Sequence, residues 1–346
     1  MASRRTTSLE VAREAGVSRT TVSLVLNNTP DSGISEDTRR RVCDASLRLN
    51  YHPNVTGRRL ASGRTHTVGF VMHQNPERAA ADLFLPQVLR GLNACLRESG
   101  YHILFRPVDP RSSRDGYAYL VYEGYVDGIV LSGPQLEESE AVALHSQGLP
   151  VVVTGRLPGH DVPFVDADNY QGAQLATNHL ISLGHRRIGL ITNAPITYIA
   201  SRERYRGFQD SLLAADLIYE PELTREGFFT SESGFKAMNA LLDLPEAPTA
   251  VFVASDVVAF GAIQAIHARG LAIPQDIALV GFDDVSVSQF IEPFLTTVRL
   301  PAYELGWEAG KLSLELINKK ELVSHGQLLP TELIVRASCG ADLREH

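Results

Sequence analysis

The sequence of 346 residues predicts an α/β protein with a small all-helical domain followed by two lobes, each built on a parallel sheet. Three observations predict this class. Up to about residue 53 the apolar residues recur at helical spacing. From Thr67 onward, short β-branched runs alternate with helical stretches. This alternation restarts near Arg187, which indicates two successive βαβ lobes.

The helical domain begins with two short predicted helices joined by a tight turn. Thr7 and Glu10 have the spacing of a capping box, and Gly16 suits the left-handed residue that ends a helix. Ser18 can cap the second helix, in which Val22 and its apolar neighbours face the first. Helix, turn and second helix together indicate a helix-turn-helix, whose second helix enters a DNA major groove.

A third helix is predicted from its cap at Ser35 to about Asn50, because Pro53 cannot continue it. Residues 54–62 could form two further turns, but Gly57 and β-branched residues make this helix weak. A segment so short is marginal alone, so we expect it to be disordered in the free protein and helical when packed or bound. A plain interdomain linker is the alternative.

The rest of the chain is read as alternating strands and helices. In the first repeat, strands are predicted at 67–72, 101–105, 127–131, 151–154 and 164–166, and helices near 84–99, 112–124, 136–147 and 171–183. In the second repeat, strands are predicted at 187–192, 227–229, 250–254 and 278–282, and helices near 203–215, 231–242 and 256–269. A helix near 303–318 and a strand near 327–335 complete the chain.

These elements predict three regions. Residues 1–53 form the helix-turn-helix domain, 54–66 a hinge helix and linker, and 67–346 the two-lobed domain. Within the last, the N-lobe takes about 67–166 plus 299–320, and the C-lobe about 167–298 plus 321–340. Ligands of parallel sheets bind at the carboxyl ends of the strands, so two facing lobes predict a binding cleft.

Charge is distributed unevenly. Residues 1–66 hold eleven Arg, no Lys and six Asp or Glu, a net charge of +5, whereas the remainder carries −13. A basic head on an acidic body suggests an anionic partner for the head only. No apolar run is long enough to span a bilayer, and Met1 leads into a polar segment, so we expect a cytoplasmic protein without a signal peptide. The three cysteines match no zinc or redox spacing.

Short motifs in a fixed order identify a resemblance that covers essentially the whole chain. They are 9–18 (LEVAREAGVS), 21–27 (TVSLVLN), 50–54 (NYHPN), Arg58, Leu60, Val68 with Gly69, 184–189 (GHRRIG), 204–208 (RYRGF), Ser255 with Asp256, 281–284 (GFDD) and 295–298 (LTTV). In this order they resemble the lactose-repressor (LacI/GalR) family of transcription regulators.

The resemblance implies a homodimer on a near-palindromic operator, with one recognition helix in each half-site. Arg19, Thr20 and Leu24 match base-contacting positions, and an arginine can donate two hydrogen bonds to a guanine. Leu60 matches a leucine that wedges between base pairs from a hinge helix, at a cost of about a few kcal/mol per unstacked step. The other DNA-contacting residues implied are Ser18, Ser23, Asn27, Tyr51, Asn54, Arg58 and Arg59.

The two lobes resemble periplasmic sugar-binding proteins, which implies a small-molecule effector in the cleft. Arg204 and Asp283 match the arginine and aspartate that clamp the ligand, as suits the vicinal hydroxyls of a sugar. Phe229 matches an aromatic residue that stacks on it. Further candidates at strand ends or in the cleft are Ser255, Asp256, Tyr198, Phe84, His73 and Asp166. Asp256 is as well suited to capping the helix that follows it.

Enzymatic chemistry finds little support in the sequence. It has no Gly-x-Gly-x-x-Gly, no Gly-x-Ser-x-Gly and no His-x-x-x-His pair beside a Glu, so we expect no cofactor and no metal. The resemblance instead implies a dimeric repressor of carbohydrate-utilisation genes, relieved by a mono- or oligosaccharide. One alternative is a purine- or nucleoside-responsive corepressed regulator of the same architecture. Another is a sugar-binding module without DNA function.

Overall fold

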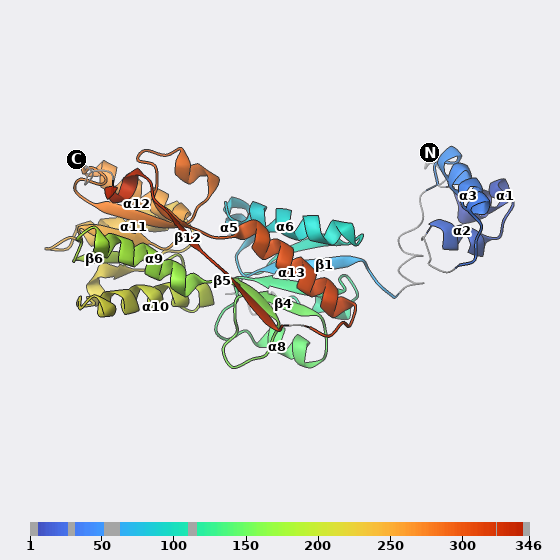
Figure 1. The fold of residues 1–346 in the computed structure, drawn as a ribbon, viewed down its shortest axis with the longest axis horizontal. Coiled ribbons are helices and arrows are strands. Elements are labelled where there is room, and N and C mark those ends of the chain that lie inside the picture. Colours follow the sequence, from blue (N-terminus) through green and yellow to red (C-terminus); the bar gives the residue numbers. More distant parts are fainter. Residues whose placement is uncertain (1–5, 27–31, 52–62, 110–115, 323, 342–346) are drawn as a thin grey trace. The chain divides into compact units, whose positions relative to one another are not determined.

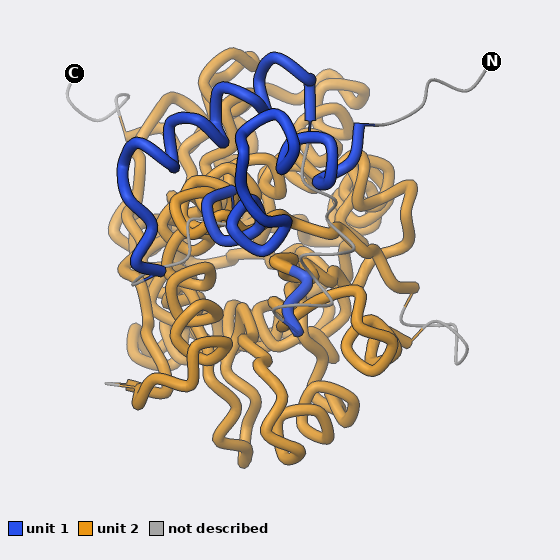
Figure 2. The backbone as a smooth tube through the Cα atoms, turned by 90° about the vertical axis from the view of Figure 1, so that its right-hand side faces the viewer, with its two compact units in different colours: residues 1–65 blue, residues 66–346 orange. Residues whose placement is uncertain are grey.

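A computed structural model describes residues 6–26, 32–51, 63–109, 116–322 and 324–341. The chain divides into two compact units, residues 1–65 and 66–346 (Figure 2). The predicted hinge, 54–62, lies outside the described residues.

The first unit consists, in its described part, of α1 (Ser8–Ala15), α2 (Arg19–Leu26) and α3 (Glu36–Arg48). The predicted capping box is confirmed, because Thr7 accepts from the Glu10 backbone N–H while the Glu10 carboxylate accepts from Thr7 N at 2.7 Å. Gly16 ends α1 with φ 66°, as expected for a left-handed cap. The apolar stripes of the three helices meet in one core: Val11, Ala12, Ala15, Val22, Val25, Val42 and Ala45.

The second unit contains two sheets, each covered by helices on both faces (Figure 1). Across the first sheet the order is β11 (Gly326–Leu329), β5 (Phe164–Ala167), β4 (Val151–Thr154), β3 (Gly128–Ser132), β1 (Thr67–Met72) and β2 (His102–Pro107). All neighbours are parallel. The covering helices are α6 (Leu85–Glu98) and α13 (Ala302–Ile317) on one face and α7 (Tyr119–Tyr122) and α8 (Ser139–Ser146) on the other.

Helices α6 and α13 of the first lobe pack closely against each other. Helix α13 lies along α6 (Figure 1), and a Cβ atom added at Gly91 would lie 1.9 Å from the Tyr303 carbonyl oxygen. Glycine is therefore required there for the two backbones to approach. A short helix, α5 (Pro76–Ala81), follows β1 and leads to α6.

The second sheet has the order β12 (Glu332–Ile334), β10 (Thr297–Arg299), β9 (Ala278–Asp283), β8 (Ala250–Val253), β6 (Ile188–Ile191) and β7 (Thr224–Arg225). Only the β10–β12 pair is antiparallel. Helices α9 (Asn169–Ser182) and α10 (Ile199–Ala214) cover one face, and α11 (Ser231–Leu242) and α12 (Asp256–Ala268) cover the other. Short 3-10 turns occupy Pro221–Leu223, Ser286–Gln289 and Ala337–Cys339. The predicted α/β class is confirmed.

Two predicted strands are wrong. The strand expected at 227–229 is instead a bend in which Phe229 has a φ of 59°, and the true strand β7 ends at Arg225. The strand expected at 327–335 is two strands in different sheets, because Pro330 has no N–H to continue a ladder. The helix expected near 112–124 is the short α7 in the part that the structure describes.

The chain crosses between the two sheets at three places in the described residues: after β5, after β10 and between β11 and β12. The prediction that residues 321–340 belong to the C-lobe is wrong for one strand. Strand β11 instead pairs with β5, in register Gly326 with Phe164, so residues 326–329 belong to the first lobe. Among the described helices, none combines the length and apolar character that crossing a membrane requires.

Candidate functional site

A cavity of about 140 Å³ lies where the strands of the two sheets end. It collects side chains from the carboxyl ends of β1, β5, β8 and β9, which is where parallel sheets bind ligands. Eight of the nine predicted effector residues line it: His73, Phe84, Asp166, Tyr198, Arg204, Phe229, Ser255 and Asp283. The cavity is the part of the described chain where the predicted residues converge.

Arg204 projects from α10 and is only 6% exposed. Its Nε donates to Asn169 Oδ1 at 2.8 Å and its Nη1 to the Ala254 carbonyl at 2.6 Å. The guanidinium carbon lies 3.9 Å from the centre of the Phe282 ring, within cation–π distance. The guanidinium plane is thus held from three sides before any ligand arrives.

Asp283 ends β9 with a φ of 116°, a backbone conformation that residues with a side chain rarely adopt. Burial raises the pKa of its carboxyl to about 6, while the Arg204 charge and a hydrogen bond from Ser255 act in the opposite direction. Burial likewise raises the pKa of Asp166 to about 7, and Asn169 Nδ2 donates to Asp166 Oδ1 at 3.1 Å. Carboxylates desolvated in this way favour further hydrogen-bond donors.

Aromatic side chains form one wall. The rings of Tyr198 and Phe229 pack edge to face, with centroids 5.2 Å apart. The strained Phe229 backbone is held because its N–H donates to the Asn193 carbonyl at 2.8 Å. Across the cleft, the Tyr198 hydroxyl donates to the His73 carbonyl at 3.1 Å, and Phe84 packs against the cores of both lobes. The wall therefore connects the two lobes.

Three polar side chains of the cavity are buried and lack partners for some of their atoms. Among the described residues, no hydrogen bond reaches either ring nitrogen of His73, Gln74 Oε1 or Asn193 Oδ1. His73 Nδ1 lies 3.4 Å from Glu138 Oε2 without hydrogen-bond geometry, and burial lowers the pKa of the imidazole. Buried polar atoms are normally paired, so these are suited to a polar ligand.

Six polar residues that line this cavity were not predicted from the sequence: Gln74, Asp82, Ser132, Thr154, Asn169 and Asn193. Gln74, Asn169 and Asn193 follow β1, β5 and β6 by two residues, so the strand-end rule could have found them. Asp82 does not follow a strand. It precedes α6, and its carboxylate accepts from the backbone N–H groups of Phe84 and Leu85 at the start of that helix.

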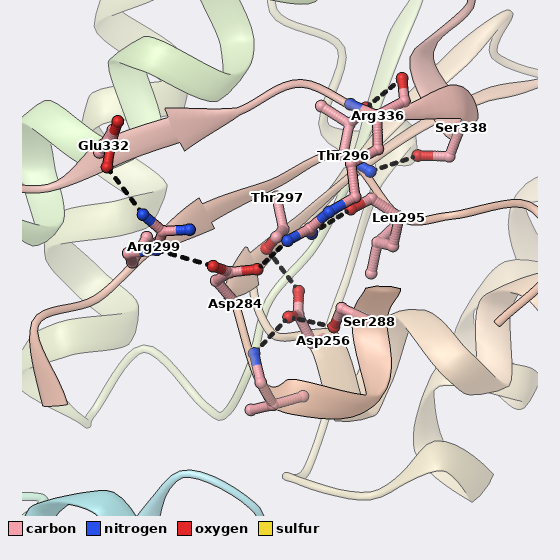
Figure 3. Close-up of polar contacts among 11 residues, drawn as sticks. Asp256, Asp284, Ser288, Leu295, Thr296, Thr297, Arg299, Glu332, Arg336 and Ser338 are labelled. Carbon is pink, nitrogen blue, oxygen red and sulfur yellow. Dashed lines mark hydrogen bonds and ion pairs between the residues drawn. The ribbon is translucent and has the colours of Figure 1, made fainter. Parts of the chain in front are cut away.

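Asp256 does not belong to the cavity, which contradicts the predicted ligand contact. Its side chain is fully buried and accepts from Thr297 Oγ1 at 2.6 Å, Ser288 Oγ at 2.6 Å and Val285 N at 3.0 Å (Figure 3). The helix cap is Ser255, so Asp256 has neither expected role. Burial raises the pKa of Asp256 to about 8, and the nearby Asp283 charge adds to this. Asp256 therefore links β10 to the segment after β9 by hydrogen bonds to both.

Asp284, next to the cavity residue Asp283, forms ion pairs with arginines at the end of β10 and just after β12. Its carboxylate binds Arg336 Nη2 at 2.6 Å and Arg299 Nε at 2.8 Å, and Arg299 also binds Glu332 at 3.1 Å (Figure 3). The end of β9 is thereby tied to β10 and to the chain around β12.

In the first unit, α2 presents a polar face. Arg19, Thr20, Ser23 and the preceding Ser18 are exposed, and Leu24 is half-buried. Arg19 Nε donates to Ser8 Oγ at 3.3 Å, which steadies its guanidinium on the surface. Ser18 Oγ accepts from Thr21 N at 3.0 Å and so caps α2.

The remaining predicted DNA-contacting residues are either packed against the core or outside the described residues. Tyr51 is half-buried and packs against the three-helix core, which gives its ring a structural role. The others lie outside the described residues: Asn27, Asn54, Arg58, Arg59 and Leu60.

Comparison with known families matches both units. The model for bacterial regulatory proteins of the lacI family matches residues 8–54, and that for the periplasmic binding protein-like domain matches 177–339. The HTH-type transcriptional regulator CelR of Thermobifida fusca is 35% identical over 347 residues, covering 98% of this chain and all of CelR. The transcriptional repressor CytR of Escherichia coli is 34% identical over 334 residues, 96% of each chain.

Solved structures of regulators are also similar to this chain. A complex of the regulator CelR with cellobiose has a TM-score of 0.74 at 34% identity, covering 96% of this chain and 100% of that one. The lac repressor dimer bound to operator and the anti-inducer ONPF has a TM-score of 0.85 at 27% identity, covering 97% and 99%. Each of these similar proteins is named as a regulator.

Proposed function

The chain belongs to the LacI family of bacterial transcriptional regulators, and from this premise we propose that it is a repressor whose hold on operator DNA is controlled by a saccharide in the interlobe cavity. The observation that carries the proposal is the fixed guanidinium of Arg204 beside the buried carboxylate of Asp283. A planar donor set next to an acceptor suits vicinal hydroxyls.

The surroundings of this pair support a polyhydroxylated ligand. The unpartnered atoms of His73, Gln74 and Asn193 offer further hydrogen bonds, while Phe229 and Tyr198 offer apolar surface to a sugar ring. The cellobiose complex of the similar regulator CelR is consistent with this class of ligand.

The DNA side of the proposal rests on α2. We propose that two copies of the chain bind a near-palindromic operator, with Arg19 and Thr20 reading base edges and Leu24 contacting a thymine methyl. Ser18 and Ser23, exposed beside them, are suited to phosphate contacts. The hinge, 54–62, folds on the operator, with Leu60 as the wedge and Arg58 and Arg59 on phosphates.

Control then follows from linkage between the two sites. A saccharide that shifts the lobes about their crossings alters how the two hinges of the dimer meet, and so weakens operator binding. Operator and inducer must then weaken each other by the same factor. This function requires no catalysis, and a regulator of this kind acts in the cytoplasm, beside the DNA.

The proposal is tested by thermal shift of the full chain against a saccharide panel and a panel of purines and nucleosides. We expect a saccharide to raise the melting temperature, because bound ligand stabilises the folded state, and Arg204→Lys to reduce this stabilisation at the same saccharide concentration. Stabilisation by purines alone rejects the saccharide in favour of a purine-responsive regulator. A random-site selection that recovers no palindromic DNA rejects the regulator and leaves a sugar-binding module.

A further inference from the structure

The effector cavity continues into a second space of about 520 Å³, here called the outer chamber. The two spaces share three lining residues, Gln74, Tyr198 and Phe229, so they adjoin one another. The outer chamber is several times larger than the inner cavity. A ligand that fills only the inner cavity therefore leaves most of the available space unused.

We propose that the effector spans both chambers and contains at least two sugar rings: one ring sits beside Arg204 and Asp283, and the next lies in the outer chamber against Phe228. This inference rests on the proposed function, because it specifies the ligand of the same site as a disaccharide or longer saccharide.

The first support is aromatic surface at the right place. Phe228 lines the outer chamber and is 41% exposed, so part of its ring is open to a ligand there. Its N–H donates to Ser233 Oγ at 2.9 Å at the start of α11, and the neighbouring Phe229 is fixed by Asn193. A rigid, half-exposed ring beside polar groups can cover the apolar face of a pyranose.

The second support lies where the chambers join. Gln74 is 6% exposed and lines both spaces. Its Nε2 donates to Asp82 Oδ2 at 3.4 Å, while its Oε1 makes no hydrogen bond among the described residues. Buried acceptors are normally paired, so a donor is expected from the ligand. A hydroxyl beside the glycosidic linkage meets that requirement.

The third support is a cation on the outer wall. Arg78, half-buried on α5, lines the outer chamber, and its backbone N–H is held by Asn75 Oδ1 at 2.9 Å. Within the described part of the chain its guanidinium makes no ion pair or hydrogen bond. It is therefore available to donate to hydroxyls of the outer ring.

The test compares matched ligands by titration calorimetry on the full chain: glucose against cellobiose and maltose, galactose against lactose and melibiose, and xylose against xylobiose. One disaccharide is expected to bind at least about tenfold tighter than its own monosaccharide. Phe228→Ala should weaken that disaccharide about threefold to tenfold and leave the monosaccharide unchanged. Arg78→Gln should do the same independently, and Phe290→Ala, at an exposed phenylalanine outside both chambers, should change neither.

The outcomes separate the two claims. A monosaccharide that binds as tightly as every disaccharide, with no effect of Phe228→Ala or Arg78→Gln, overturns the two-ring inference and leaves the proposed function standing. Binding of no saccharide by wild type rejects the proposed function, and the inference with it.

Discussion

Arg204 Nη1 and Asp283 Oδ1 lie 3.5 Å apart in the cavity, further than the about 2.7–2.9 Å of a tight charge-assisted hydrogen bond. Both side chains are nearly buried, at 7% and 11% exposure. Arg204 bonds more closely to Ala254 and Asn169 than to Asp283. The pair is thus oriented by the protein and retains hydrogen-bonding capacity for a ligand.

Replacing Arg204 by lysine keeps the charge and removes the planar donor set. We expect effector affinity to fall about 10- to 100-fold, the range for a lost hydrogen bond to a charged group, while operator affinity without effector is unchanged. Calorimetry measures the effector affinity, and fluorescence anisotropy of labelled operator measures the operator affinity. Wild-type effector affinity in Arg204→Lys would contradict the clamp.

Lysine is a better probe here than alanine. Arg204→Ala leaves Asp283 and Asp166 without their cation, and breaking a buried pair costs about 3–5 kcal/mol. A loss of response in that variant could then reflect unfolding. Far-UV circular dichroism and an unfolding curve for Arg204→Lys provide the control.

The pKa of Asp166, raised to about 7, makes stability depend on pH. The unfolded carboxyl titrates near pH 4, so between about pH 4 and 7 the native state holds a proton that the unfolded state has lost. Its contribution to stability is present below about pH 4 and is lost as pH rises through about 7, by at most about 1.4 kcal/mol per pH unit.

Asp166→Asn cannot titrate and should flatten this decline. Urea unfolding at pH 5, 6, 7 and 8 gives the free energy of unfolding for both proteins. Asp256 contributes a slope of the same sign in each, so the informative quantity is the difference between them. Identical slopes in wild type and variant would show that Asp166 is ionised in the folded state.

The two arginines on Asp284 should differ in their contribution to stability. The Arg336 side chain is 17% exposed and also donates to the Leu295 carbonyl at 2.7 Å, whereas Arg299 is 50% exposed. We expect Arg336→Gln to cost about 3 kcal/mol or more, as for a buried pair, and Arg299→Gln less than about 1 kcal/mol. Equal losses in urea unfolding would mean that exposure does not decide the strength of these pairs.

Base reading by α2 is tested at Arg19. Arg19→Ala should cost about 1–3 kcal/mol, roughly 5- to 150-fold, on the selected operator and relax the preference at one base pair of each half-site. Binding to random DNA should fall by much less. A uniform loss on both DNAs would assign Arg19 to phosphate contact instead of base reading. Effector binding, measured on the same preparation, should not change.

The sequence predicts the elements best where one local interaction decides them. Thr7, Glu10 and Gly16 fix both ends of α1 through side-chain and left-handed caps, and these needed no tertiary information. The β-branched runs likewise located the central strands, because a strand buried on both faces is apolar along its length.

Errors occur where distant contacts override the local pattern. Phe228 and Phe229 have strand-like side chains, yet the bonds from their N–H groups to Ser233 and Asn193 bend the chain there. Ser255 and Asp256 are adjacent, and only the positions of Thr297 and Ser288 decide which of them is turned away from the cavity. Pro330 could have indicated from the sequence that the strand predicted at 327–335 is interrupted, because proline has no N–H for the ladder.

The most direct test of the account is the coupling between the saccharide and the operator. Operator anisotropy of the full chain is titrated at fixed salt with the saccharide found by thermal shift, and calorimetry repeats the saccharide titration with operator present. We predict at least a tenfold fall in operator affinity, and an equal fall in saccharide affinity on the operator. Tight saccharide binding that leaves operator affinity unchanged would contradict the account.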